Sequence, residues 1–148
     1  MKEPSEKRKR TLALHERALR FSNNVISSCP ERFSNMPSSR VWDQLVRAAD
    51  STSNNLIEAD GASSDADVLN KMCTALKEAK ESRAALMKVR VCGLDSADKV
   101  AGLNLESEAS QLSAIFATII LNMRLRLDEE ARKRKRRNSD SNSNSNSN

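Results

Sequence analysis

The chain has 148 residues, of which 38% are hydrophobic and 30% charged, with one Trp, three Phe, no Tyr, three Gly and three Pro. Scarce aromatic and turn-forming residues favour long helices, and this length suffices for one domain with a buried core. The sequence lacks the roughly 20 apolar residues of a membrane span and the apolar region of a secretory signal, and its three widely spaced cysteines suit a reducing compartment, so we expect a cytoplasmic protein without membrane contact.

The net charge of +5 is concentrated at the two ends of the chain. Residues 1–10 carry +3 and residues 128–148 carry +2, whereas the residues between them are neutral. We therefore predict a basic N-terminal extension (1–10), a helical body (11–131), and a basic run followed by a Ser/Asn-rich tail (132–148). Cationic extensions of this kind bind phosphates without regard to sequence.

The first predicted helix spans residues 5–28 and ends before Pro30, because the residue preceding a proline is kept out of the helical region. Apolar residues at helical spacing give its core stripe, Leu14, Ala18, Phe21 and Val25, widened by Leu12, Leu19 and Ile26. His15, the only histidine, falls beside this stripe, and we expect it to pack there. A metal site would need further ligands at recognisable spacing.

The second predicted helix begins at Ser38 or Ser39, either of which can cap it, and stops at Gly61. Its core stripe has steps of three and four: Val41, Leu45, Ala48, Thr52, Leu56 and Ala59. Beside this stripe lies a polar band that helix propensity does not explain: Arg47, Ser51, Asn54, Asn55 and Glu58.

The third predicted helix begins near Ser64, which forms an acidic capping box with Asp67, and ends at Cys92. Its stripe alternates steps of four and three: Val68, Met72, Ala75, Ala79, Ser82, Leu86 and Val89. A connection with a short helical turn at residues 96–101 follows. The fourth helix carries Leu105, Ala109, Leu112, Phe116, Ile119 and Met123. Residues 132–137 should prolong it into solvent, and residues 138–148 should be disordered.

Four helices with short connections favour an all-α fold, an antiparallel up-down-up-down four-helix bundle with disordered basic and Ser/Asn-rich tails. Apolar flanks remain beyond the core stripes of the second and third helices: Trp42, Val46, Ala49 and Ile57, and Leu69, Cys73, Leu76 and Met87. Large exposed apolar patches are costly in solution, so these flanks predict self-association.

The second and third helices carry a recognisable pattern. It reads Arg47-Ala48-Ala49-x-Ser51-x-x-x-Asn55-Leu56-x-Glu58, then Ser63 or Ser64, then Ala75-Leu76-Lys77-Glu78-Ala79-x-Glu81-Ser82. It resembles the four-helix-bundle family of intervening-sequence proteins, which are encoded within inserts of bacterial large-subunit ribosomal RNA genes. That family is related in fold to the accessory variability protein (Avd) of diversity-generating retroelements. The resemblance covers residues 12–127, although Ser53, Ala59, Ala84 and Ala85 depart from the family pattern.

The resemblance implies a ring, a homopentamer, whose basic channel or face binds nucleic acid. In the retroelement branch it also implies a reverse transcriptase as partner. It implies no enzyme, and we expect no catalytic residue, cofactor or metal site. Our leading hypothesis is a homo-oligomeric nucleic-acid-binding bundle, with RNA as the ligand. The alternative is a protein-docking accessory subunit of a reverse transcriptase.

Two interpretations apply to the polar residues that match the family: Arg47, Ser51, Asn55, Glu58 and Glu81. They form either an internal network that locks the second helix to the third, or a polar binding site. We favour the network, with Glu58 and Glu81 accepting hydrogen bonds from Asn55, Ser51 or Arg47, because buried polar groups need partners and such networks fix packing. Catalysis by these carboxylates would need a substrate pocket, which nothing in the sequence indicates.

Three groups of cations are candidates for phosphate binding. The first is a cationic run of six contiguous residues: Arg132, Lys133, Arg134, Lys135, Arg136 and Arg137. The second is the N-terminal group of Lys7, Arg8, Lys9 and Arg10. The third is Lys80 with Arg83, which would line a phosphate-binding surface if rings form. Solvated charge is the simpler alternative for Lys80 and Arg83.

Overall fold

The computed structural model describes residues 3–145, which form five helices and no strand. In chain order they are α1 (Glu6–Ser28), α2 (Met36–Asp60), α3 (Asp65–Val91), α4 (Ala97–Gly102) and α5 (Leu105–Ser145). The predicted all-helical class is confirmed. The short helix α4 occupies the place of the turn expected at residues 96–101, one residue later along the chain.

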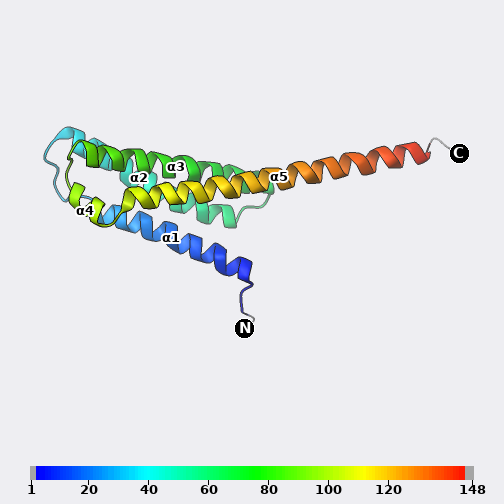
Figure 1. Cartoon of the computed structure of the whole chain (residues 1–148), viewed down its shortest axis with the longest axis horizontal. Helices are drawn as coiled ribbons and strands as arrows, with labels where there is room; N and C mark the ends of the chain where they lie inside the picture. The colour runs from blue at the N-terminus through cyan, green and yellow to red at the C-terminus, as the bar shows by residue number, and fades with distance from the viewer. Residues whose placement is uncertain (1–2, 146–148) are drawn as a thin grey trace.

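The four long helices lie along one axis, and the chain reverses direction between successive long helices (Figure 1). Helix α3 packs against both α2 and α5, and α1 packs mainly against α2. Contact between α1 and α5 is limited, and the two helices diverge toward the start of α1 (Figure 1). The start of α1 and the C-terminal part of α5 therefore lie at the same end of the molecule.

Side chains cap the first three helices. Ser5 Oγ accepts a bond from the N–H of Arg8 at 3.3 Å, and Ser64 Oγ accepts from the N–H of Asp67 at 3.2 Å. The predicted cap of the second helix is wrong: Asn35 Oδ1 accepts from the N–H of Ser38 at 2.9 Å, and α2 begins at Met36. The second residue of α2 is proline, which a helix tolerates in its first turn.

The predicted stripes form most of the core, which is completed by a few further residues. The largest of its fully buried side chains are Phe21, Trp42, Leu45, Leu86, Leu105, Leu112 and Phe116. Two expectations are corrected. Trp42 and Ala49, assigned to an association flank, are fully buried within the chain, and Trp42 Nε1 donates to the Asp95 carbonyl at 2.9 Å. Conversely, three residues expected to widen the core on α1 are 38–45% exposed: Leu12, Leu19 and Ile26.

Ion pairs supplement the apolar contacts between helices. Arg17 on α1 donates two bonds to the carboxylate of Glu108 on α5, at 2.6 and 2.9 Å, and these bonds raise the pKa of Arg17. Arg90 on α3 donates from Nε to Glu106 on α5 at 2.8 Å, which lowers the pKa of Glu106. Both α1 and α3 are thereby linked to the first turns of α5, close to α4.

The ends of the chain agree in part with the prediction. Residues 6–10 belong to α1 and α5 continues through the cationic run, as the predicted helices did, but α5 then extends to Ser145, where we predicted a disordered tail. Glu129 and Lys133, one turn apart, pair at 2.8 Å, and such pairs support a helix. Residues 146–148 of the predicted tail lie outside the described residues, as do residues 1–2 of the N-terminal extension.

Candidate nucleic-acid interface

The C-terminal part of α5 is a helical projection that carries the cationic run. Arg126 Nη2 donates to Asp65 Oδ1 at 3.0 Å, and beyond this contact the helix runs clear of the other helices (Figure 1). We call residues 127–145 the α5 extension. At 1.5 Å per residue, the cationic run lies roughly 9–17 Å past Arg126 along the helix axis. Its six side chains, in residues 132–137, are all exposed.

The N-terminal cations occupy the first turns of α1. Arg8 pairs with Asp60 at the end of α2, and Lys9 Nζ lies 3.2 Å from Glu6 Oε1. Lys7 and Arg10 line an open depression of about 340 Å³ where α1 diverges from α5. Two of these cations are thus paired with carboxylates, and the other two border a space between helices.

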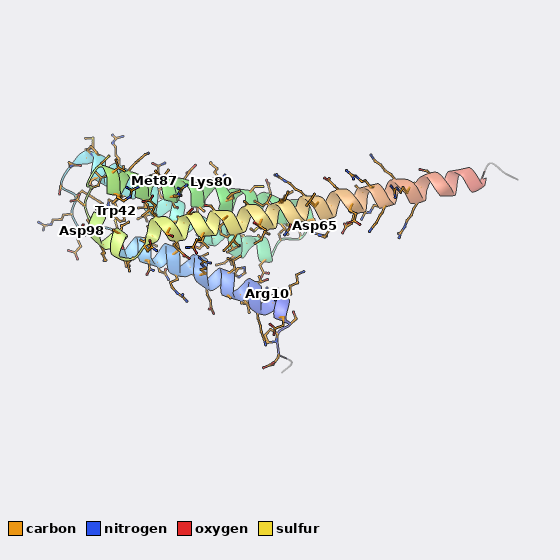
Figure 2. The ribbon with its side chains drawn as sticks, in the orientation of Figure 1. Arg10, Trp42, Asp65, Lys80, Met87 and Asp98 are labelled. Carbon is orange, nitrogen blue, oxygen red and sulfur yellow. The ribbon has the colours of Figure 1, made fainter. Side chains whose placement is uncertain are left out.

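The two cationic groups lie at the same end of the molecule. Arg10 and Asp65 both lie toward the end from which the α5 extension projects (Figure 2). The turn between α2 and α3 is at this end too, and its flanking carboxylates, Asp60 and Asp65, each bind an arginine, Arg8 and Arg126. The fold therefore places at the same end of the molecule two cationic segments that are more than a hundred residues apart in sequence.

Lys80 and Arg83 are placed elsewhere. Both are exposed on α3, and Lys80 is 15 residues past Asp65, or about 22 Å along the helix. Figure 2 shows Lys80 on the body of α3, away from the projecting end. Within one chain, Lys80 and Arg83 therefore lie apart from both the cationic run and the N-terminal cations.

The polar band forms only part of the predicted network. Asn55 Nδ2 donates to the Ser51 carbonyl at 2.9 Å and to Ser51 Oγ at 3.1 Å. Arg47 pairs with Asp43 of its own helix at 3.5 Å. The two glutamates pair with lysines: Glu58 with Lys71 at 2.5 Å and Glu81 with Lys77 at 3.6 Å. The α2–α3 link is thus Lys71–Glu58, and the hydrogen bond that Lys71 donates to Glu58 raises the pKa of Lys71.

Some of these polar residues share an open depression of about 370 Å³ between α2 and α3. Its lining consists of Asp43, Gln44, Arg47, Ala48, Ser51, Glu78 and Glu81. Three carboxylates against one guanidinium make this surface acidic. This surface would repel phosphate, whereas the exposed cations of the other groups would attract it.

Other site types find little support in the part of the chain that the structure describes. No group of three or more His, Cys, Asp and Glu residues there could hold a metal ion. No described helix is both long enough and apolar enough to cross a membrane. His15 is half-buried on α1, as expected for a packing residue.

The fold and this surface define a class: small, all-helical proteins with cationic segments at one end. A model of the 23S rRNA-intervening sequence protein family matches residues 10–117, and the chain belongs to this family. The match runs from α1 into the first part of α5, and the cationic run lies beyond it. No curated protein and no solved structure matches the chain.

Proposed function

We propose that this protein is a non-enzymatic, homo-oligomeric RNA-binding protein built on an up-down-up-down bundle of its four long helices. The observation that carries the proposal is the cationic run, six contiguous exposed cations on a helix that projects from the body. Each phosphate that such a cation neutralises releases a counterion, which makes binding strong at low salt and weak at high salt. The family name refers to 23S rRNA, which favours RNA as the ligand.

The N-terminal cations support the same function. Lys7, Arg8, Lys9 and Arg10 lie at the end of the molecule from which the α5 extension leaves, so one strand of nucleic acid could contact both groups. The neutral body supplies little attraction of its own. In an oligomer, Lys80 and Arg83 of neighbouring copies would add a second, repeated phosphate-binding surface.

Exposed apolar side chains support self-association. Leu12, Leu19 and Ile26 recur every seventh residue on one face of α1, and Leu121 and Leu125 are more than half exposed on α5. A helix face with this spacing suits packing against another helix. We propose a ring of identical copies, a homopentamer, and Leu19→Glu should shift the mass measured by light scattering toward the monomer.

The second candidate function is docking to a protein, as an accessory subunit of a reverse transcriptase related to the Avd system. The neutral body and its exposed apolar face on α1 favour this candidate, because protein interfaces deplete charge at their centres. In this case the body would capture the partner and nucleic acid contact would be secondary.

Two truncations test the leading proposal by filter binding of RNA across a range of salt concentrations. Removal of residues 132–148 should weaken RNA retention and flatten its salt dependence, whereas removal of residues 138–148 keeps the cationic run and should change little. Partner capture that survives the longer truncation would support the docking candidate. A full-length protein that shows no salt-sensitive RNA retention would contradict the leading proposal.

A further inference from the structure

The cationic run surrounds its helix. Successive residues of an α-helix are about 100° apart, so the six contiguous cations of residues 132–137 point in all directions around the axis. A helix that binds one strand of phosphates on one side needs cations on that side alone. The distribution on α5 suits a ligand that presents phosphates on opposite sides of the helix.

The α5 extension offers little to a protein or a membrane. From Asp128 to Ser139 its only apolar residue is Ala131, so it has no apolar face for a partner helix or a lipid surface. Three acidic residues, Asp128, Glu129 and Glu130, separate the cationic run from the body. One of them, Glu129, pairs with Lys133, and the hydrogen bond from Lys133 lowers the pKa of Glu129. Phosphate is a chemical complement to a helix whose exposed side chains are cationic in this way.

Because the cationic run is helical, its ligand must have a groove wide enough to hold a helix. Like charges one turn apart, Arg132 with Arg136 and Lys133 with Arg137, destabilise a helix, so phosphates on both sides would strengthen it. An α-helix with side chains is about 10–12 Å wide, which matches the major groove of B-form DNA, about 12 Å. The major groove of uninterrupted A-form RNA is deep and narrow.

We propose that the α5 extension binds double-helical RNA as a helix, in a major groove widened by unpaired nucleotides, with phosphates of both strands around the cationic run. This inference rests on the RNA binding proposed above and names the class of RNA. A widened groove supplies two phosphate walls, whereas a single strand supplies one. The body, which the α5 extension leaves at Arg126, stays outside the groove.

The test breaks the helix while it keeps every charge. Ala131→Pro removes a helical hydrogen bond between the body and the cationic run and kinks or breaks the helix there. Ala131→Ser is the matched control, since serine is tolerated in helices far better than proline. Both variants and the parent protein are titrated with four ligands of equal length: single-stranded RNA, continuous RNA duplex, RNA duplex with an internal loop, and DNA duplex.

We expect the parent and Ala131→Ser to bind the interrupted RNA duplex about tenfold more tightly than single-stranded RNA at equal salt, and Ala131→Pro to lose most of that preference while keeping its affinity for single strands. Far-UV circular dichroism should show that Ala131→Pro retains the unfolding transition of the body. Equal binding of single and double strands by the parent overturns the inference alone. The inference is also overturned if Ala131→Pro keeps the preference for the interrupted RNA duplex over single-stranded RNA, or if the parent binds the DNA duplex more tightly than the interrupted RNA duplex. Absence of binding to all four ligands overturns the proposed function as well.

Discussion

Arg126 Nη2 lies 3.0 Å from Asp65 Oδ1, which ties α5 to the start of α3 just where α5 leaves the body. The bond raises the pKa of Arg126. On the other side of the same turn, Asp60 binds Arg8 of α1. The turn between α2 and α3 thus contacts α1 through Arg8, one of the N-terminal cations, and α5 through Arg126, six residues before the cationic run.

Asp65→Asn should strengthen RNA binding. The substitution leaves Arg126 with one carboxylate partner, Glu130 at 3.1 Å, and removes a negative charge near the cationic end, so we expect affinity to rise about two- to threefold at low salt. The pair is half-exposed, with side-chain exposures of 49% and 50%, so the thermal unfolding midpoint should hardly change. Filter binding with labelled RNA measures the effect.

Asp43→Asn is the charge-matched control for that experiment. Asp43 is an exposed carboxylate of α2 that pairs with Arg47, away from the turn that holds Asp65. Asp43→Asn changes the net charge by the same amount as Asp65→Asn. An equal rise in RNA affinity for the two variants would show that the position of Asp65 has no special effect.

Trp42 should be the most sensitive single position for stability. Its side chain is fully buried, and its indole N–H donates to the Asp95 carbonyl. Trp42→Ala should lower the free energy of unfolding by about 3–5 kcal/mol, and Trp42→Phe, which keeps most of the apolar contact, by about 1–2 kcal/mol. Urea unfolding followed by circular dichroism measures both values. A Trp42→Phe protein as stable as the parent would show that the indole hydrogen bond contributes nothing.

Asp95 should make stability depend on pH in the acid range. Hydrogen bonds from Ser34, and then Ser38, lower the pKa of Asp95 below its ordinary value of 3.8. The Asp95 carboxylate therefore binds a proton less readily in the folded state than in the unfolded state. The contribution is fully present above pH 3.8 and is lost as the pH falls through the lower pKa of the folded state.

The variant Asp95→Asn tests this dependence. It should unfold at a lower temperature than the parent at neutral pH, and the difference should shrink on acidification below the ordinary carboxyl pKa of about 3.9. Thermal unfolding of both proteins across that range gives the comparison. A difference that stays constant down to the most acidic sample would contradict the assigned role of the Asp95 carboxylate.

Helical periodicity was enough to predict the all-helical class and most of the buried faces of the helices. It located the core positions of α2 and α3, and the cap at Ser64, because these follow from spacing within one helix. It misassigned Trp42 and Ala49 to an association surface, since spacing tells which residues share a face and leaves open which neighbour covers that face. The segment around Asp95, more than fifty residues away in sequence, contacts the indole of Trp42.

The candidate site was predictable in part. The cationic run of residues 132–137 is plain in the sequence, because six adjacent cations need no fold to be noticed. Its position at the same end of the molecule as the N-terminal cations depends on the order and direction of the helices. The partner of Glu58 was missed because Lys71 lies on the next helix, and only the folded chain brings the two together. The pair of Lys77 with Glu81 spans one helical turn, so the sequence alone could have indicated it.

The salt dependence of RNA affinity tests the central claim most directly. A variant with all six residues of 132–137 replaced by glutamine is compared with the parent, and a second variant with Arg132, Arg134, Arg136 and Arg137 changed to lysine keeps the charge. The slope of log K against log salt should fall in magnitude by about 3–5 in the glutamine variant and stay unchanged in the lysine variant. An unchanged slope in the glutamine variant would contradict the claim that the α5 extension binds the phosphates.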